Sequence, residues 1–403
     1  MGQGIKGFAG VALLAGVALC SACGSSDGRD SGGSDEDRDT TAEAPDGRGQ
    51  PGDTTAEAPD GSGQPGDTTA DAPDGSGQPG DTTADAPDGS GQPGDTTADV
   101  GGPYPEGLSD QTLDLDGTVR QYRVHVPIGL TSPRAVVFVL HGGGGEGLGV
   151  AELGEHPLSV FRTVADREGF VVVYPGGLPA NDSTRRVGWV DCRADNTVSS
   201  GADDVGFLAA LVTRVRDEYG LTSAEMFMTG GSNGAQMTHA FAFVHADLVG
   251  AVATGSGSLP ETPLPGPCTA GPSRPLPILI LHGTGDTQMP WDGGCVANVG
   301  GACNRGRVIS AEATRERWLQ INGLAGVMPA QSVIEVSTDD AGPANRWDYA
   351  GATPVQWWRL DGAGHTTPSQ TVLTGSNPVT GTQSRDIEFA EVVWAFFESR
   401  LLD

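Results

Sequence analysis

Lysine is almost absent from this chain, and positive charge is scarce throughout. The 403 residues include 52 aspartates and glutamates but only 23 lysines and arginines, of which Lys6 is the single lysine. A phosphate-binding P-loop needs a lysine after its glycines, so the glycine-rich stretches beyond residue 102 are not such loops. The formal net charge of −29 also argues against nucleic acid as a partner.

Aliphatic side chains are nearly missing between residues 24 and 102. A 14-residue unit, DTTAEAPDGRGQPG at 39–52, repeats there with close copies at 53–66, 67–80 and 81–94. A unit whose apolar content is alanine cannot bury enough surface to offset the loss of chain entropy, so we expect no solenoid. The unit also lacks the compact carboxylate cluster of a calcium repeat. Proline, glycine and acidic residues favour a self-repelling tether, and we predict a disordered acidic linker over 23–102.

Much of the acidity belongs to this linker. Residues 24–102 contain 19 acidic and 3 basic residues, which leaves 33 acidic and 19 basic residues in 103–403. About 300 residues suit one large α/β domain. We therefore expect residues 103–403 to fold as a single domain.

An apolar run long enough to be a confident membrane span is missing at the N-terminus. Residues 5–22 contain a lysine, a short apolar run and then small residues, which is typical of a secretory signal peptide over 1–22. The sequence before Cys23 resembles a bacterial lipoprotein cleavage site, with Cys20 where leucine is usual. We predict lipidation of Cys23 and an anchor in the bacterial cell envelope. Plain secretion is the alternative.

Zinc-ligand spacing is absent from the cysteines beyond residue 102, where neither Cys-x-x-Cys nor a nearby histidine accompanies them. An even number of cysteines in an exported region favours disulfides over a metal site. Cys295 and Cys303 bracket a glycine-rich loop and form the first predicted pair, which leaves Cys192 with Cys268. No metal and no cofactor are expected.

Residues 103–403 alternate between strand and helix patterns. The apolar runs at 135–140 and 170–174 are typical of strands buried on both faces, and 121–126 alternates like an edge strand. The sequence predicts a mostly parallel sheet covered by helices on both faces, with the chemistry at the carboxyl ends of the strands. Further strands are expected at 225–229, 248–254, 278–281 and 355–360, and helices at 157–167, from 203 onward, and at 233–245, 311–322 and 387–401.

The stretch TGGSNGAQM, residues 229–237, places Ser232 between a predicted strand and a predicted helix. In a strand–helix elbow the nucleophile has a strained backbone and stands clear of the sheet. Side chains two residues before and after it would collide, so Gly230 and Gly234 suit the turn. We predict Ser232 as a nucleophile, with a helix N-cap serine as the alternative.

A serine nucleophile needs a base, and His365 is the candidate among seven histidines. It lies in DGAGHTTP, between the last predicted strand and the last predicted helix. His141 and His282 occur in Leu-His-Gly, where the ring usually satisfies local backbone groups. The others have no comparable context: His125, His156, His239 and His245.

A carboxylate should orient the base, and Asp286 in LHGTGDTQMP follows the predicted strand at 278–281. The chain order Ser232, Asp286, His365 is that of α/β-hydrolases. Rival carboxylates are Asp339, Asp340 and Asp361.

The run His-Gly-Gly-Gly-Gly after the strand at 135–140 matches a loop that donates an N–H group to an oxyanion. We expect donors from Gly143 and Gly144 and from the backbone of Asn233, whose side chain has no assigned role at this point.

Five stretches occur in order over some 250 residues: LHGGGG, DDVGFLAALV, TGGSNGAQM, LHGTGDTQMPWDGG and GAGHTTP, followed by WAFFES. Together they resemble the poly(3-hydroxybutyrate) depolymerase and feruloyl esterase family, related to carbohydrate esterase family one. The resemblance implies an α/β-hydrolase fold and a secreted serine esterase with Ser232, Asp286 and His365 at the matching positions. Many relatives have tryptophan where this chain has Thr367, which leaves the acyl specificity open. Trp291 and Trp189 are candidates for an aromatic cleft wall, or for plain packing.

The sequence thus predicts an exported, lipid-anchored, monomeric serine esterase. Feruloyl or acetyl esters of plant polysaccharide are the expected substrates, with polyhydroxyalkanoate as the alternative. A serine peptidase is less favoured, because nothing resembles an acidic pair that binds a peptide N-terminus. A surface binding lipoprotein without turnover is the hypothesis from another class.

Overall fold

The structure is a computed structural model, and it describes residues 102–403 apart from 145–146, 182, 298–302 and 402–403. The predictions of a signal peptide over 1–22 and of lipidation at Cys23 lie outside the described residues, as does the linker predicted over 23–102 except for its last residue. Within the described part of the chain, no helix combines the length and the apolarity that crossing a membrane requires.

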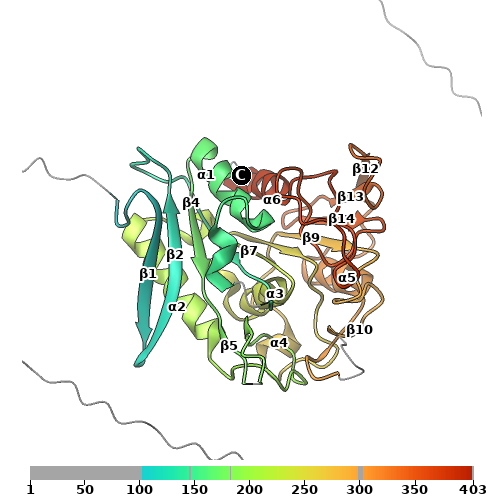
Figure 1. The fold of residues 1–403 in the computed structure, drawn as a ribbon, viewed down its shortest axis with the longest axis horizontal. Coiled ribbons are helices and arrows are strands. Elements are labelled where there is room, and N and C mark those ends of the chain that lie inside the picture. Colours follow the sequence, from blue (N-terminus) through green and yellow to red (C-terminus); the bar gives the residue numbers. More distant parts are fainter. Residues whose placement is uncertain (1–101, 145–146, 182, 298–302, 402–403) are drawn as a thin grey trace, which may run out of the picture. The chain divides into compact units, whose positions relative to one another are not determined.

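A ten-stranded sheet forms the centre of the domain (Figure 1), in the order β1-β2-β4-β3-β7-β8-β9-β14-β13-β12. Its six middle strands are parallel to one another. Nearly every residue of these strands is buried, as continuous apolar runs require when helices cover both faces. They are β4 (Val171–Pro175), β3 (Val136–Leu140), β7 (Met226–Gly231), β8 (Ala251–Gly255), β9 (Ile278–Gly283) and β14 (Val355–Leu360).

The two margins of the sheet are antiparallel. On one side β1 (Gly107–Leu115) pairs along its whole length with β2 (Thr118–Val126). The prediction that 121–126 forms an edge strand is therefore wrong, because β1 covers that edge. No residue of β1 is fully buried, and half-buried and exposed residues alternate along most of the strand. Because the strand is largely polar, a search for apolar runs does not find it. On the other side lie β13 (Ala344–Tyr349) and the largely exposed β12 (Ala330–Ile334).

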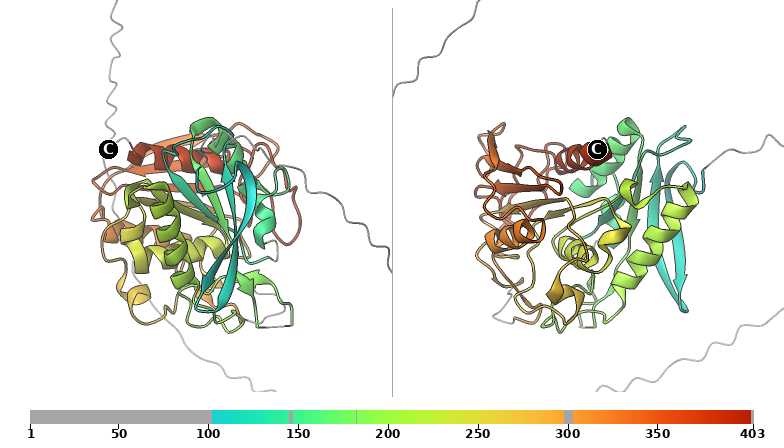
Figure 2. Two further views of the ribbon diagram at one scale, coloured as in Figure 1. Left: turned by 90° about the vertical axis from the view of Figure 1, so that its left-hand side faces the viewer. Right: turned by 180° about the vertical axis from the view of Figure 1, so that it is seen from behind.

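Helices cover both faces of the sheet (Figures 1 and 2). On one face α1 (Val160–Glu168) packs beside α6 (Phe389–Leu401), with Phe170 stacked on Trp394 at 4.0 Å between ring centroids. The opposite face holds α2 (Asp204–Tyr219), α3 (Asn233–His245) and α5 (Ala311–Ile321). This arrangement confirms the predicted α/β-hydrolase fold class.

Short elements complete the connections between these layers. They are β5 (Leu178–Pro179), β6 (Val187–Gly188), β10 (Gly294–Cys295), β11 (Arg307–Val308), α4 (Pro267–Ala270), and the 3-10 helices Gly147–Ala151, Pro157–Ser159, Ser223–Glu225 and Ala246–Leu248.

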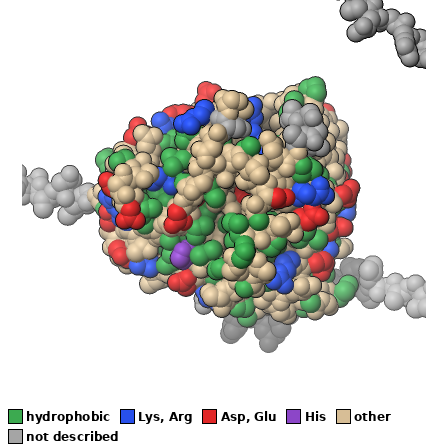
Figure 3. All heavy atoms as spheres, turned by 90° about the horizontal axis from the view of Figure 1, so that it is seen from below, with side chains coloured by type: hydrophobic (Ala, Val, Ile, Leu, Met, Phe, Trp, Pro, Cys, Tyr) green, Lys and Arg blue, Asp and Glu red, His purple; other side chains and the backbone are tan. Residues whose placement is uncertain are grey.

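Two disulfides tie the loops at the carboxyl edge of the sheet. Cys192 is bonded to Cys268, with 5.6 Å between Cα atoms, and Cys295 to Cys303, with 5.2 Å. Cys192 follows β6 and Cys268 belongs to α4, so the first bond holds the segment that precedes α2. Figure 3 views the domain from the side on which these loops lie, where hydrophobic side chains gather in the middle of the face.

Candidate active site

The backbone at Ser232 is strained in the way a nucleophile elbow requires. Ser232 has φ 55° and ψ −124° and joins the end of β7 to the start of α3. The two flanking glycines are needed on steric grounds. A Cβ on Gly230 would lie 2.6 Å from the carbonyl carbon of Gly234, and one on Gly234 would lie 2.4 Å from the oxygen of Leu140. The tight turn therefore exposes a serine at a helix N-terminus, where free N–H groups point outward.

Ser232, His365 and Asp286 lie in a hydrogen-bonded chain. The Nε2 atom of His365 is 2.7 Å from the Oγ of Ser232, and its Nδ1 is 2.8 Å from Oδ2 of Asp286. The three residues come from the carboxyl ends of β7, β14 and β9, which are neighbours in the sheet apart from β8. Parallel strands bring these loops to one edge, so residues 133 and 79 positions apart in sequence meet there.

The carboxylate of Asp286 is held rigidly. It is 4% exposed, and its Oδ1 accepts hydrogen bonds from the backbone N–H groups of Gln288 and Met289 at 2.9 and 2.8 Å. This arrangement leaves Oδ2 for His365. The rival carboxylates lie elsewhere: Asp361 pairs with Arg359, while Asp339 and Asp340 bond to Arg385.

Of the other buried histidines, His125 pairs with Asp166, whereas His141, His239 and His282 bond to backbone oxygens. His141 accepts a hydrogen bond from the N–H of Gly177 on Nε2, at 2.9 Å, which leaves Nδ1 to donate to the carbonyl of Gly142 at 2.8 Å. Complete burial lowers the pKa of His141 to about 4, so the ring is neutral near pH 7. His282 is also fully buried, with a lowered pKa, and its Nε2 is 2.9 Å from the oxygen of Met289.

The glycine run after β3 approaches the elbow closely. A Cβ on Gly142 would lie 3.4 Å from the Cβ of Ser232, and one on Gly143 would lie 3.2 Å from the Cβ of Asn233. Gly144 also lines the space in front of Ser232, and a Cβ there would meet nothing within 4 Å. A side chain at Gly143 would therefore crowd Asn233, whereas Gly142 and Gly144 leave room for a Cβ.

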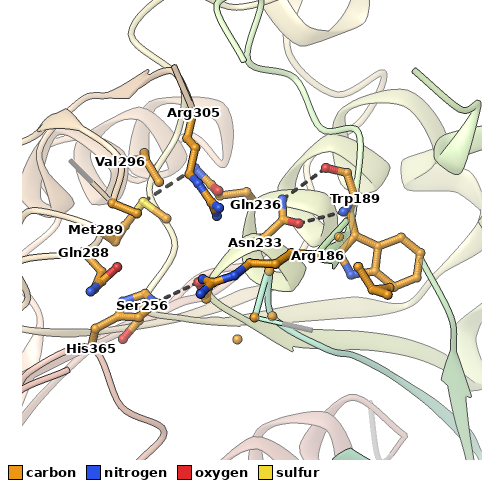
Figure 4. Close-up of a pocket in the computed structure, with 18 of the residues that line it drawn as sticks. Arg186, Trp189, Asn233, Gln236, Ser256, Gln288, Met289, Val296, Arg305 and His365 are labelled. Atoms are coloured by element: carbon orange, nitrogen blue, oxygen red, sulfur yellow. Dashed lines mark hydrogen bonds between the residues drawn. The ribbon is translucent and has the colours of Figure 1, made fainter. Parts of the chain in front are cut away.

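The side chain of Asn233 has a role that the sequence does not reveal. Its Oδ1 accepts from the N–H of Trp189 at 2.7 Å, and its Nδ2 donates to the oxygen of Trp189 at 3.2 Å (Figure 4). The Nδ2 atom also donates to Asp191 at 2.8 Å. Asp191 in turn forms a buried ion pair with Arg193 at 2.7 Å. The first residue of α3 thus fixes the segment that precedes the Cys192–Cys268 disulfide.

A cavity of about 750 Å³ opens in front of Ser232 and His365. Thr367 and Trp189 line it, whereas Trp291 is not among its described lining residues and instead lies against His282 and Trp357. Trp189 is only 2% exposed, and its indole N–H donates to the carbonyl of His141 at 2.9 Å. Most of the Trp189 side chain therefore supports the wall from behind.

Sequence reasoning assigns no role to several residues that line the cavity. Arg186 precedes β6, Ser256 follows β8 with φ 51°, and Gln288 follows Asp286. The rim also includes Thr374, Asn377, Val379 and Thr380, from the loop between β14 and α6. The only sequence signal was position, since Ser256 and Gln288 follow the carboxyl ends of parallel strands.

The parallel sheet, the strained serine turn and the Ser–His–Asp arrangement define a protein of the α/β-hydrolase fold. Over 178 residues the chain is 30% identical to feruloyl esterase C of Emericella nidulans, which covers 43% of this chain and 58% of that protein. Over 135 residues it is 30% identical to acetylxylan esterase A of Aspergillus awamori, which covers 33% of this chain and 41% of that protein. The chain therefore spans less than two thirds of either relative.

These relatives confirm the resemblance to feruloyl esterases that the motifs indicate. Among solved structures, an acetyl xylan esterase from Aspergillus awamori covers 65% of this chain and 95% of its own, at 21% identity and a TM-score of 0.45. No protein-family model matches the chain.

Proposed function

We propose that the protein is a serine hydrolase of carboxylic esters. Ser232 attacks the ester carbonyl while His365 takes its proton on Nε2, and Asp286 fixes the ring and supports its positive charge. His365 then protonates the leaving alcohol, and the acyl group stays on the serine. Water, activated by the same histidine, releases the acid and restores the serine.

The observation that carries this proposal is the chain of two short hydrogen bonds at the floor of the cavity, 2.7 and 2.8 Å long. A helix N-cap serine would need no histidine at this distance and no buried carboxylate behind it. Asn233, Gly143 and Gly144 line the same cavity, and in this proposal their backbone N–H groups donate to the developing oxyanion.

A fluorophosphonate probe tests the nucleophile directly. We expect covalent labelling of the wild type and none of Ser232→Ala, with parallel loss of ester hydrolysis. A folded control is Ser258→Ala, because Ser258 is buried and does not line the cavity among the described residues. An unlabelled wild type would favour a surface binding lipoprotein without turnover, and equal labelling of wild type and Ser232→Ala would overturn Ser232 as the nucleophile.

For the substrate, we propose feruloyl or acetyl esters carried by plant polysaccharide. The names of the relatives support this choice, and the cavity is large enough for an aromatic acyl group. Polyhydroxyalkanoate is the alternative. Three assays separate the candidate substrates. They measure the release of ferulate from methyl ferulate, of acetate from acetylated xylan, and of soluble acid from a hydroxybutyrate film.

We also propose that the protein is exported and anchored to the cell envelope through Cys23. Two disulfides in the domain support an oxidising compartment. Mass spectrometry of the mature N-terminus tests the anchor: a diacylglyceryl group on Cys23 is expected, and an unmodified cleaved N-terminus would leave plain secretion.

A further inference from the structure

The charged side chains that line the cavity are positive, although the domain as a whole is negatively charged. Beyond residue 102 the chain has 33 acidic and 19 basic residues. Yet the described residues that line the cavity include three arginines, Arg186, Arg193 and Arg305, and neither an aspartate nor a glutamate. A cleft that excludes carboxylates within an acidic domain concentrates positive potential where the substrate binds.

The three arginines differ in what holds them. Arg193 is buried and neutralised by Asp191, with its Nη2 atom 2.7 Å from the carboxylate. Arg305 lies beside it, between β10 and β11, and its backbone carbonyl accepts a hydrogen bond from Arg193. Arg186 is exposed and pairs with no carboxylate of the described residues. In Figure 4 its side chain extends from the wall that carries Trp189 toward the side of Ser256 and His365.

A positive lining has a cost in an esterase. Every turnover produces a carboxylate beside Ser232, and nearby guanidinium groups slow its release because opposite charges attract. An intact substrate that already carries negative charge would gain binding energy from these groups before its ester bond is cleaved. A guanidinium fork is also well matched to a carboxylate, to which it donates two parallel hydrogen bonds.

We propose that the preferred substrate is an anionic ester, with a carboxylate that Arg186 binds while Ser232 attacks a separate ester bond. This inference rests on the proposed ester hydrolase activity. The carboxylate can belong to the acyl part, as in a half-ester of a dicarboxylic acid, or to the alcohol part, as in an acylated hydroxy acid. Both present the same group to Arg186, and the test has one arm for each.

The experiment compares matched pairs of neutral and anionic esters. Para-nitrophenyl butyrate and para-nitrophenyl hemisuccinate place the charge on the acyl side. Methyl para-acetoxybenzoate and para-acetoxybenzoate place it on the alcohol side. For each pair the ratio of kcat/KM, anionic over neutral, is measured in wild type and in Arg186→Gln, so the intrinsic reactivity of each ester cancels. Arg185→Gln is the matched control, since Arg185 is exposed, adjacent and outside the described lining.

We expect Arg186→Gln to lower the ratio by about tenfold in at least one pair, which is the effect of one charge-assisted contact. Arg185→Gln should leave the ratio unchanged. In the wild type alone, added salt should lower the same ratio, because exposed charges are screened. This second measurement does not depend on the folding of a variant.

The outcomes separate this inference from the proposed function. Turnover with equal ratios in wild type and Arg186→Gln, together with a salt-independent ratio, overturns the anionic preference and leaves the ester hydrolase standing. If the ratio falls equally in Arg186→Gln and Arg185→Gln, the preference comes from the general positive potential of this surface, and the specific role of Arg186 is overturned. Failure to hydrolyse any of the four esters overturns both proposals.

Discussion

The side-chain amide of Asn233 bonds both polar groups of the Trp189 backbone, accepting from its N–H at 2.7 Å and donating to its carbonyl at 3.2 Å. Asn233 also begins the helix that follows Ser232, and Trp189 supports the cavity wall. One residue therefore joins the nucleophile turn to the substrate wall. Because its backbone N–H is a proposed oxyanion donor, a change in the side chain tests positioning while the N–H remains.

Replacing Asn233 by alanine should separate positioning from stability. Asn322 makes the same two-way pair with Leu276, at 3.2 and 2.9 Å, and neither residue lines the cavity within the described part of the chain. We expect Asn233→Ala and Asn322→Ala each to cost about 1–3 kcal/mol of unfolding free energy, since each leaves buried polar groups unpaired. Only Asn233→Ala should lower kcat, by roughly tenfold or more.

Denaturant unfolding and initial rates on one ester measure both effects. If the two variants lose stability to a similar extent and neither loses kcat, the amide of Asn233 is merely structural.

The elbow should not tolerate a methyl group at Gly234. A Cβ there meets the Leu140 and His141 oxygens at 2.4 and 2.5 Å, and neither backbone atom can move without distorting β3. We expect Gly234→Ala to cost about 2 kcal/mol or more and to abolish probe labelling. Gly149→Ala is the control, because nothing lies within 4 Å of its Cβ position. A stable, labelled Gly234→Ala would contradict the steric account.

Loss of the charge on Asp286 should reduce turnover without unfolding the domain. Asp286→Asn keeps the shape but presents a neutral amide to His365, and an amide can hold the wrong tautomer of the ring. A fall in kcat on the order of 10⁴-fold is expected. Asp361→Asn should change kcat little, since Asp361 contacts Arg359 and Asn345 rather than a histidine. Comparable losses in both variants would reopen the assignment of the carboxylate.

Two buried histidines should make the domain acid-sensitive. Burial lowers the pKa of His141 and of His239 to about 4 in the folded state, below the value of about 6.5 in an unfolded chain. Well above pH 6.5 both histidines are neutral in the folded and in the unfolded chain, so their titration costs no stability. As pH falls from about 6.5 to about 4, the two histidines bind protons in the unfolded chain but stay neutral in the folded domain. The free energy of unfolding therefore decreases.

Urea unfolding over this pH range measures the slope. His239 contacts the indole N–H of Trp318 and lies away from Ser232, so His239→Gln is the suitable variant. It should lower stability at neutral pH and reduce the slope by roughly 1 kcal/mol per pH unit, the effect of one proton. Parallel curves for wild type and His239→Gln would show that His239 is not the titrating group.

Much of the sheet could be predicted because its signals are local. The apolar runs at 135–140, 170–174 and 278–281 correspond to buried parallel strands, and a strand buried on both faces needs such a run wherever it lies. The margins were harder to predict. β1, β12 and β13 are partly exposed and antiparallel, so their composition carries no continuous apolar signal, and β1 takes the edge that the pattern assigned to 121–126.

For the site, the sequence by itself determined the serine turn and the order of the candidate groups. Gly230 and Gly234 are required by contacts within a few residues, and the chain order Ser232, Asp286, His365 is written in the sequence. Tertiary structure alone decided which carboxylate meets His365, where the Asn233 side chain binds, and that Arg186 points into the cavity while Trp291 packs elsewhere. Those relationships join loops from separate strands, and only the packing of the sheet brings such loops to one edge.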